Sequence, residues 1–440
     1  MLPIRHISTL SALHFVEDGF SVCCVCMLAL SISKEHSLSL ALLYNAIAFL
    51  SQPFTGMIAE KILHKPLLAI SSTGFMAISL LLLAITGHTS SIPMAYVTAI
   101  VVGIGNSLFH VWGGIETTRH SGNDIRALGL FVSTGAVGLS VGSIFASRTL
   151  LSVFLGIFCI LVLYYLSPSS SSSKIAESDT VRFPKWFSFK PWQIWLVVIL
   201  MMSIVMFRSM YGGHLSLNIG SIHSQILVVS LIAMCGKALG GFIAWRIGLF
   251  KTLSLVFIGL LVCYLFRGRL PHLSVLGFLL INLTMSITLF LNNEVLKGKE
   301  GLSFGLLAFS LMPVYLVAQF GIDNSLIIEY ILVALLPTIL IELAVLRIFE
   351  RRSEVLWSSV VVNILTNSAL NLFVFYFHWS LASILIGELI VLVLESLWYW
   401  YFTSSILRSI YYSLLCNISS FLIGLVIVNT INVKPLLSNQ

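Results

Sequence analysis

Charged residues are scarce in this sequence. Only 9% of its 440 residues are Asp, Glu, Lys or Arg, while 58% are hydrophobic and the mean hydropathy is +1.02. A water-soluble protein of this length could not bury so much apolar surface in a core. Apolar runs of roughly 18 to 25 residues recur along the chain, and each is long enough to cross ~30 Å of hydrocarbon. Because the runs are continuous and not alternating, they predict transmembrane helices.

Sequence motifs of the common enzyme and phosphate-binding sites are also missing. The sequence has no His-Glu-x-x-His motif and no phosphate-binding Gly-x-x-x-x-Gly-Lys-Ser/Thr loop, so we do not expect an enzyme. Its seven cysteines lie mostly inside apolar runs and lack metal-ligand spacing. We therefore expect no disulfide, no metal site and no cofactor. The N-terminal segment lacks the cleavage site of a signal peptide, which predicts that the first helix stays in the membrane.

The apolar runs predict fifteen helices. The net charge of +7 is better explained by basic residues in cytoplasmic loops than by nucleic-acid binding, and with the N-terminus in the cytoplasm most lysines and arginines fall on that side. The predicted spans are 8–32, 37–59, 66–86, 92–113, 127–147, 149–166, 191–209, 222–245, 250–266, 272–293, 302–320, 325–347, 355–377, 381–403 and 409–431.

Two polar segments divide these helices. The first, 167–192, begins with a serine run typical of a flexible linker, and the second is FERRSE at 349–354. They predict an N-terminal six-helix bundle (1–166), a cytoplasmic linker (167–190), a C-terminal six-helix bundle (191–348) and an extra three-helix membrane module (349–440). The fold class predicted is therefore an all-α polytopic membrane protein with two pseudo-symmetric six-helix bundles and three additional helices.

Two pairs of segments indicate that the six-helix bundles are repeats. GMIAEK at 56–61 follows the second helix, and GFIAWR at 241–246 follows the eighth. SLFHVWGGIE at 107–116 ends the fourth helix, and ITLFLNNEVLKGKEG at 287–301 ends the tenth. Parallel six-helix halves joined by a long loop are typical of secondary transporters.

With these segments the chain resembles the major facilitator superfamily, whose signature between helices 2 and 3 is similar to GMIAEK. The closest resemblance is to fosmidomycin-resistance-type efflux proteins, through HFVED at 14–18, SQP at 51–53, NSLFH at 106–110 and the segment 293–305. The resemblance implies a transporter of the bacterial cytoplasmic membrane that exports a small amphipathic molecule in exchange for protons by alternating access.

The first helix carries a candidate proton-coupling group. His14 and Asp18 are four residues apart and share a helix face, with Glu17 as a near neighbour. A carboxylate beside an imidazole in a low-dielectric interior can titrate in the physiological range, as proton coupling requires. The alternative is a charge-compensated structural pair.

In the resembled superfamily, helices 1, 4, 7 and 10 line a central cavity. This arrangement would bring Asn106 and His110 of the fourth helix towards Asn293 and Glu294 of the tenth. The alternative for Asn293 and Glu294 is a position at the membrane interface, because the polar run GKEG follows at once. Intramembrane polar side chains are functional candidates by default, although His110 could also be a hydrated residue at headgroup level. Lys237, midway along the eighth helix, is expected to face the cavity and pair with a carboxylate.

Polar residues at helix ends predict other clusters. Arg208, His214 and His223 are expected in a hydrated external cluster. Arg119 and Arg126 are expected to dock on the first signature loop as a latch of ion pairs, the alternative being weak surface pairs. The predicted cytoplasmic gate comprises Gly56, Glu60, Lys61, Arg119, Arg126, Gly241 and Arg246.

The three extra helices leave a second function open. Asn363 and Asn367 lie on one helix, and Glu388 and Glu395 on the next, as stripes that could hold the helices together or line a polar path. In that alternative, the chain is a carrier-fold sensor, scaffold or partner subunit, with 355–431 contacting another membrane protein. The loss of an acid from the second signature segment favours this alternative.

Overall fold

The structure is a computed structural model. It describes residues 4–62, 66–89, 91–167, 191–213, 221–266, 272–312, 335–352 and 381–431, together with 355–356, 358–360, 362–363, 366 and 370. Every regular element in these ranges is a helix, which confirms the all-α prediction. The helices are α1 (Ile4–Ser31), α2 (Lys34–Asn45), η1 (Ala46–Leu50), α3 (Gln52–Lys61), α4 (Pro66–Thr89), α5 (Ile92–Ser121), α6 (Ile125–Ile144), α7 (Arg148–Leu166), α8 (Pro191–Gly213), α9 (Ile222–Ile247), α10 (Leu249–Phe266), α11 (His272–Asn282), α12 (Thr284–Val295), α13 (Glu300–Phe309), α16 (Leu336–Phe349), α18 (Leu381–Thr403) and α19 (Ile406–Ile431).

Eleven stretches of the described residues are helices long and apolar enough to cross a membrane. They coincide with the first ten predicted spans and with the fourteenth. The helices α13, α16 and α19 and the described positions between 355 and 370 are helical where the other four spans are predicted. The protein is therefore an integral membrane protein.

The second predicted span is interrupted by a proline. Pro53 has no N–H group, and its ring would clash with the carbonyl oxygen four residues earlier in a regular α-helix. The chain widens into the π-helix η1 just before this point and resumes as α3 with Pro53 in its first turn. One membrane span is thus built from α2, η1 and α3.

Glycines bring α1 and α6 together. A Cβ atom built on Gly138 would overlap the backbone of Phe15, and one on Gly142 would overlap the backbone of Gly19. Small residues at this spacing let two helix backbones approach closely in a membrane. The glycines of α6 thus serve helix packing, and the close approach places the polar face of α1 against α6.

The described chain forms two compact units. Unit 1 contains α1 to α9, the first part of α10, and α11 to α13; unit 2 contains residues 260–266, α16, the described positions 355–370, α18 and α19. The predicted boundary at 349 does not coincide with this division, because α16 packs with α19 inside unit 2. The predicted domains remain a prediction.

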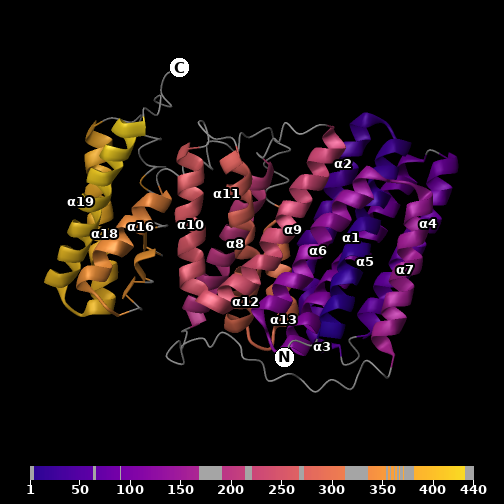
Figure 1. The fold of residues 1–440 in the computed structure, drawn as a ribbon, viewed down its shortest axis with the longest axis horizontal. Coiled ribbons are helices and arrows are strands. Elements are labelled where there is room, and N and C mark those ends of the chain that lie inside the picture. Colours follow the sequence, from indigo (N-terminus) through magenta and orange to yellow (C-terminus); the bar gives the residue numbers. More distant parts are fainter. Residues whose placement is uncertain are drawn as a thin grey trace. The chain divides into compact units, whose positions relative to one another are not determined.

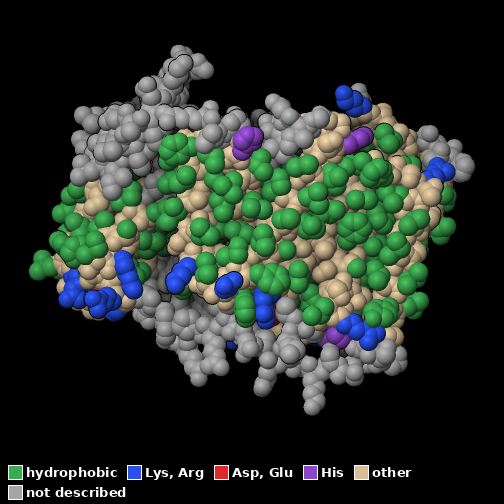
Figure 2. Space-filling view, in the orientation of Figure 1, with side chains coloured by type: hydrophobic (Ala, Val, Ile, Leu, Met, Phe, Trp, Pro, Cys, Tyr) green, Lys and Arg blue, Asp and Glu red, His purple; other side chains and the backbone are tan. Residues whose placement is uncertain are grey.

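Unit 1 presents an apolar face of the kind that lipid covers. Figure 2 shows a broad band of hydrophobic side chains across its helices, with lysine and arginine gathered towards its edges. Exposed basic residues such as Lys61, Arg246 and Lys297 come from the ends of α3, α9 and α12, near the edge at which Figure 1 marks the N-terminus. This edge is called the N-terminal side below.

Unit 2 is held together by buried polar groups. Glu395 of α18 is fully buried and accepts hydrogen bonds from Thr366 (3.0 Å), from Ser413 (3.1 Å) and from Asn417 of α19 (2.6 Å). The amide of Asn363 donates to the buried carboxylate of Glu342 in α16 (2.6 Å). These bonds match the predicted role of polar stripes as contacts between helices, although Asn367 lies outside the described residues.

Replacing Glu395 with leucine is expected to lower the thermal stability of unit 2. Three donors, of which Thr366 and Ser413 are buried, would lose this acceptor, and each buried unsatisfied group costs about 1–3 kcal/mol. Cys416 is fully buried in the same core, so a thiol-reactive dye added to a variant retaining only this cysteine reports the unfolding of unit 2. Glu395→Gln keeps an acceptor oxygen and should melt closer to the wild type. Equal melting of Glu395→Leu and the wild type would contradict the structural role.

Candidate functional site

A cluster of imidazoles and a carboxylate lies inside unit 1. The Nε2 atoms of His14 on α1 and His110 on α5 are 3.1 Å apart. The Asp18 carboxylate lies 3.2 Å from His14 Nε2 and 3.3 Å from His110 Nε2. All three side chains are buried, with at most 8% of each residue exposed. The alternative that His110 is hydrated at headgroup level is therefore wrong.

A second carboxylate supports this cluster. Glu17 is completely buried and accepts hydrogen bonds from Ser21 (2.7 Å) and from the amide of Asn106 (2.9 Å). Its other neighbour is Nδ1 of His110, at 3.6 Å. The five residues predicted from α1 and α5, namely His14, Glu17, Asp18, Asn106 and His110, thus form one connected group.

Backbone carbonyls fix the orientation of both imidazoles. His14 Nδ1 donates to the carbonyl oxygen of Phe131 on α6 (2.7 Å), and His110 Nδ1 donates to that of Asn106 (3.0 Å). Because a carbonyl can only accept, each Nδ1 carries a hydrogen and a neutral ring presents a lone pair at Nε2. Two lone pairs and a carboxylate facing one another repel unless a positive charge lies between them. A proton or a metal cation between these groups would relieve the repulsion, and one ligand atom from each of the three residues lies within 4.8 Å of the others.

Gly135 of α6 leaves the space that this cluster fills. A Cβ atom at this position would overlap the Asp18 carboxylate and the His14 ring. The tight α1–α6 contact thus lets the imidazole and the carboxylate lie directly against helix backbone.

The facing half of the bundle covers the cluster with an aromatic ring. Phe304 of α13 packs against Gly114, where a Cβ atom would meet its ring atoms at 2.5 and 2.7 Å. Its ring centroid lies 6.3 Å from that of His110 and 6.2 Å from that of Phe131. Phe304 was not predicted as a site residue. In the sequence it is one of 29 phenylalanines, and nothing marks it until α13 is placed against α5.

Two cationic side chains, buried Arg208 and half-buried Lys237, come from the C-terminal half of unit 1. Lys237 of α9 interacts electrostatically with Asp18 and with Arg208 of α8, but it forms no ion pair with a described residue. Its predicted pairing with a carboxylate is therefore not confirmed. Arg208 is only 6% exposed, so its prediction as part of a hydrated external cluster was wrong. His223 is exposed as predicted, and His214 lies outside the described residues.

The predicted gate residues form close contacts on the N-terminal side. Gly56 of α3 lies against Gly301 of α13, where a Cβ atom would overlap the carbonyl group of Gly301. The Glu60 carboxylate accepts the backbone N–H of Leu302 in the first turn of α13 (2.9 Å). A carboxylate at a helix N-terminus is favoured by both the unpaired N–H groups and the helix dipole. We call the contact between α3 and α13 the first latch.

A left-handed turn between α5 and α6 supplies a second latch. Gly122 (φ 60°) ends α5, and Asn123 (φ 59°) follows in the same conformation. This turn aims the amide of Asn123 at Glu294 (2.9 Å), while the amide of Asn293 donates to Thr118 (3.0 Å) and to Asn123 (3.1 Å). Asn293 and Glu294 were predicted in the central cavity. They belong to the second latch, because they lie in the last turn of α12.

The remaining gate residues have other partners than predicted. Arg119 pairs with Glu300 (3.6 Å), and Arg126 pairs with Asp124 (2.6 Å) and stacks on the ring of Trp245 (4.3 Å). The predicted docking of both arginines on Glu60 and Lys61 was therefore wrong.

Three further gate residues can be placed on the N-terminal side. Gly241 lies against the backbone of Ile125 at the start of α6. Lys61 and Arg246 are exposed at helix ends. Gly241 thus packs two helices together, whereas the two basic residues face outward.

Two Gly-x-Ser-x-Gly strings need a structural interpretation. They are GLSVG at 138–142 and GLSFG at 301–305. In hydrolases this motif forms a sharp turn between a strand and a helix. Here the first string lies inside α6 and the second inside α13, and both use their glycines for helix packing. Neither string forms a nucleophile elbow.

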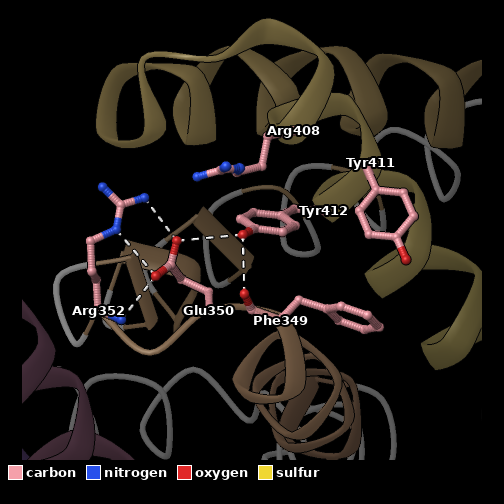
Figure 3. Close-up of a pocket in the computed structure, with 6 residues that line it drawn as sticks. All are labelled: Phe349, Glu350, Arg352, Arg408, Tyr411 and Tyr412. Atoms are coloured by element: carbon pink, nitrogen blue, oxygen red, sulfur yellow. Dashed lines mark hydrogen bonds and ion pairs between the residues drawn. The ribbon is translucent and has the colours of Figure 1, made fainter.

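A separate pocket of about 440 Å³ lies at the surface of unit 2 (Figure 3). The guanidinium of Arg352 binds Glu350 with two hydrogen bonds (2.8 and 3.1 Å), and these bonds lower the pKa of Glu350 to about 2. Tyr412 also contacts this carboxylate (3.4 Å), and Arg408 remains exposed above it. Glu350 is already paired with Arg352, and Arg408 adds a second positive charge, so this pocket is basic at neutral pH. It contains no group that suits proton coupling.

The comparisons with known proteins identify the fold. The sequence matches no protein-family model and no curated protein. Among solved structures, the Escherichia coli fucose:proton symporter is similar, with a TM-score of 0.52 and 13% identity over 74% of this chain and 93% of the symporter. The human organic anion transporter MFSD10 is similar with a TM-score of 0.51 and 12% identity over 74% of this chain and 96% of that chain. Both are transporters of the major facilitator superfamily.

The chain has the major facilitator fold. At this level of identity the similarity shows the fold alone. The chemistry of the His14–Asp18–His110 cluster therefore follows from its own geometry and not from these similarities.

Proposed function

We propose that this protein is a secondary active transporter that couples the movement of a small molecule to protons by alternating access. The observation that carries the proposal is the cluster of His14, Asp18 and His110, supported by Glu17. Ionisable side chains in a membrane interior are costly and rarely lack a function. In this cluster two imidazole Nε2 atoms face each other and the two oxygens of one carboxylate, and protons bound there would relieve their repulsion.

The position of the cluster supports coupling to a conformational change. His110 lies beneath Phe304, which belongs to α13, and α13 also carries one side of the first latch. Opening the latches on the N-terminal side would move α13 and uncover the cluster. Lys237 on α9 interacts electrostatically with Asp18 across the two halves, so it would sense the same protons.

The finer parts of the proposal follow the family resemblance. It implies efflux of a small amphipathic molecule in exchange for protons, across a bacterial cytoplasmic membrane with the N-terminus in the cytoplasm. The alternative is a carrier-fold sensor or scaffold. Its specific support is unit 2, which has its own apolar core and polar network, while about a quarter of the chain has no counterpart in either solved transporter.

Asp18→Asn is expected to reduce cargo-driven proton movement at least about tenfold, because it removes the charge on which both imidazoles converge. The full chain is reconstituted into vesicles containing a pH-sensitive dye, and a panel of amphipathic cations and anions is added across an imposed pH gradient. His223→Gln serves as the control, since His223 is exposed and outside the cluster. Proton movement that is insensitive to Asp18→Asn would remove the cluster from the mechanism. A panel that drives none in the wild type would favour the scaffold alternative.

A further inference from the structure

The ligand atoms of the buried cluster lie close to one another. His14 Nε2 is 3.1 Å from His110 Nε2 and 3.2 Å from Oδ2 of Asp18, while His110 Nε2 is 3.3 Å from Oδ1 of the same carboxylate. Around a tetrahedral Zn²⁺ ion with bonds of about 2.0–2.1 Å, neighbouring nitrogen and oxygen ligands lie about 3.3 Å apart. All three distances are close to this spacing, with one oxygen of the Asp18 carboxylate facing each imidazole.

The neighbouring hydrogen bonds are those of metal-binding histidines. A metal-bound imidazole usually donates its other N–H to a carbonyl or a carboxylate, which fixes its tautomer and orientation. Here His14 Nδ1 donates to the Phe131 carbonyl. His110 Nδ1 lies 3.0 Å from the Asn106 carbonyl and 3.6 Å from the Glu17 carboxylate. Both Nε2 atoms are thus oriented as ligands by groups on three helices.

We propose that His14, Asp18 and His110 bind a divalent transition-metal ion of the Zn²⁺ type. Two imidazoles and one carboxylate are ligands suited to Zn²⁺, Co²⁺, Mn²⁺ or Fe²⁺, and the set contains no thiolate of the kind that selects Cu⁺. Three protein ligands leave one position open to water or to an exchanging ligand, unlike the four-ligand shell of a structural zinc. The ion is therefore exchangeable. This inference goes beyond the transport proposal and can be tested without it.

Charge and space fit the same ion. Asp18 and Glu17 together supply two negative charges, which a divalent cation would balance in a medium of low dielectric constant. Gly135 lets the His14 ring and the Asp18 carboxylate lie directly against the backbone of α6, so no side chain of that residue separates the ligands. The charged group that opposes the ion is Lys237 on α9, which interacts electrostatically with Asp18.

The sequence could not indicate this site because its ligands do not follow a local motif. His14 and His110 are separated by 96 residues and belong to different helices. The prediction of no metal site rested on cysteine spacing, whereas these ligands are imidazoles and a carboxylate. Only the packing of α1 against α5 and α6 brings them together.

Cobalt binding to the purified full-length protein tests the proposal. The protein is isolated in detergent through a tag without histidine, stripped with a chelator and titrated with Co²⁺, whose visible bands report coordination. We expect one Co²⁺ per chain with bands of a four-coordinate site, displaced by Zn²⁺. Asp18→Asn and His110→Gln should each weaken Co²⁺ binding about 100-fold or more, and Glu17→Gln about tenfold, because it acts through His110. Lys237→Met should tighten binding about threefold by removing a like charge.

His223→Gln is the matched control, because it removes an exposed histidine from a helix that does not contribute ligands. Absence of stoichiometric binding, or binding unchanged in Asp18→Asn, would overturn the proposal. X-ray absorption of the Zn²⁺-loaded wild type does not depend on any variant folding. It should show two imidazoles and oxygen at about 2.0–2.1 Å, whereas sulfur ligation would place the ion on cysteines. Metal binding without proton movement would contradict the transport proposal alone, and Asp18-dependent proton movement without metal binding would contradict this inference alone.

Discussion

Replacing Gly138 with leucine is expected to lower the melting temperature of unit 1 by about 5 °C or more. A Cβ atom at this position would overlap the carbonyl group of Phe15, which belongs to the backbone of α1 and cannot move aside by changing rotamer. The two helices would have to separate, and overpacking a well-packed interior costs about 1–3 kcal/mol even where side chains can adjust. Separation would also withdraw His14 and Asp18 from Gly135.

The cysteines of α1 make this measurement direct. Cys23 and Cys24 are fully buried, so a thiol-reactive dye reaches them only when α1 is released. Gly156→Leu is the matched control, since Gly156 of α7 is exposed and a Cβ atom there meets nothing within 4 Å. Both changes place leucine in a helix and gain the same helix propensity, so the difference between them isolates packing. Equal melting curves would show that α1 and α6 do not approach as described.

The α1 part of the site could be predicted because its residues are close in the sequence. The four-residue spacing of His14 and Asp18 puts both on one helix face whatever surrounds the helix. Membrane helices hide polar groups from lipid, so Asn106 and His110 on another helix could be expected nearby. The sequence could not supply the orientation of the imidazoles, because it depends on the carbonyl of Phe131 on a third helix.

The predicted contacts were wrong where they depend on how close to the end of its helix a residue lies. Asn293 and Glu294 follow the apolar run of α12 directly, and the sequence does not say whether such residues point into a cavity or lie at its mouth. They meet Asn123 because a left-handed turn ends α5 at the same depth. Arg208 shows the opposite error. Its place at a helix end predicted hydration, but tertiary packing buries it.

The latch partners could not be predicted for a similar reason. Opposite charges near loops can pair in many ways with similar energies, since exposed pairs contribute only about 0–1 kcal/mol each. Glu60 instead accepts a backbone N–H at the start of α13, a group that every helix offers and no sequence motif marks. Contacts between the two halves thus depend on backbone geometry, and two glycines, Gly56 and Gly301, make that geometry possible.

Gly56→Leu is therefore expected to open the N-terminal side of unit 1. Closure there requires α3 and α13 to touch through glycine backbone, and a leucine side chain at position 56 has no space in that state. The hydrogen bond from the backbone N–H of Leu302 to the Glu60 carboxylate would be lost as well. A cost of about 3 kcal/mol to the closed state would change the ratio of closed to open molecules about 100-fold.

Spin labels at Lys61 and Lys299, in a variant whose seven native cysteines are replaced, measure this change as a distance distribution. Both positions are exposed, one at the end of α3 and the other just before α13. The Gly56→Leu distribution should shift to longer distances. Gly74→Leu on α4, where a Cβ atom meets nothing within 4 Å, should leave it unchanged. A distribution that stays short in Gly56→Leu would mean that α3 and α13 do not form the closing contact. The shielding of His110 by Phe304 would then need another element to release it, because α13 carries both Phe304 and the glycine that contacts Gly56.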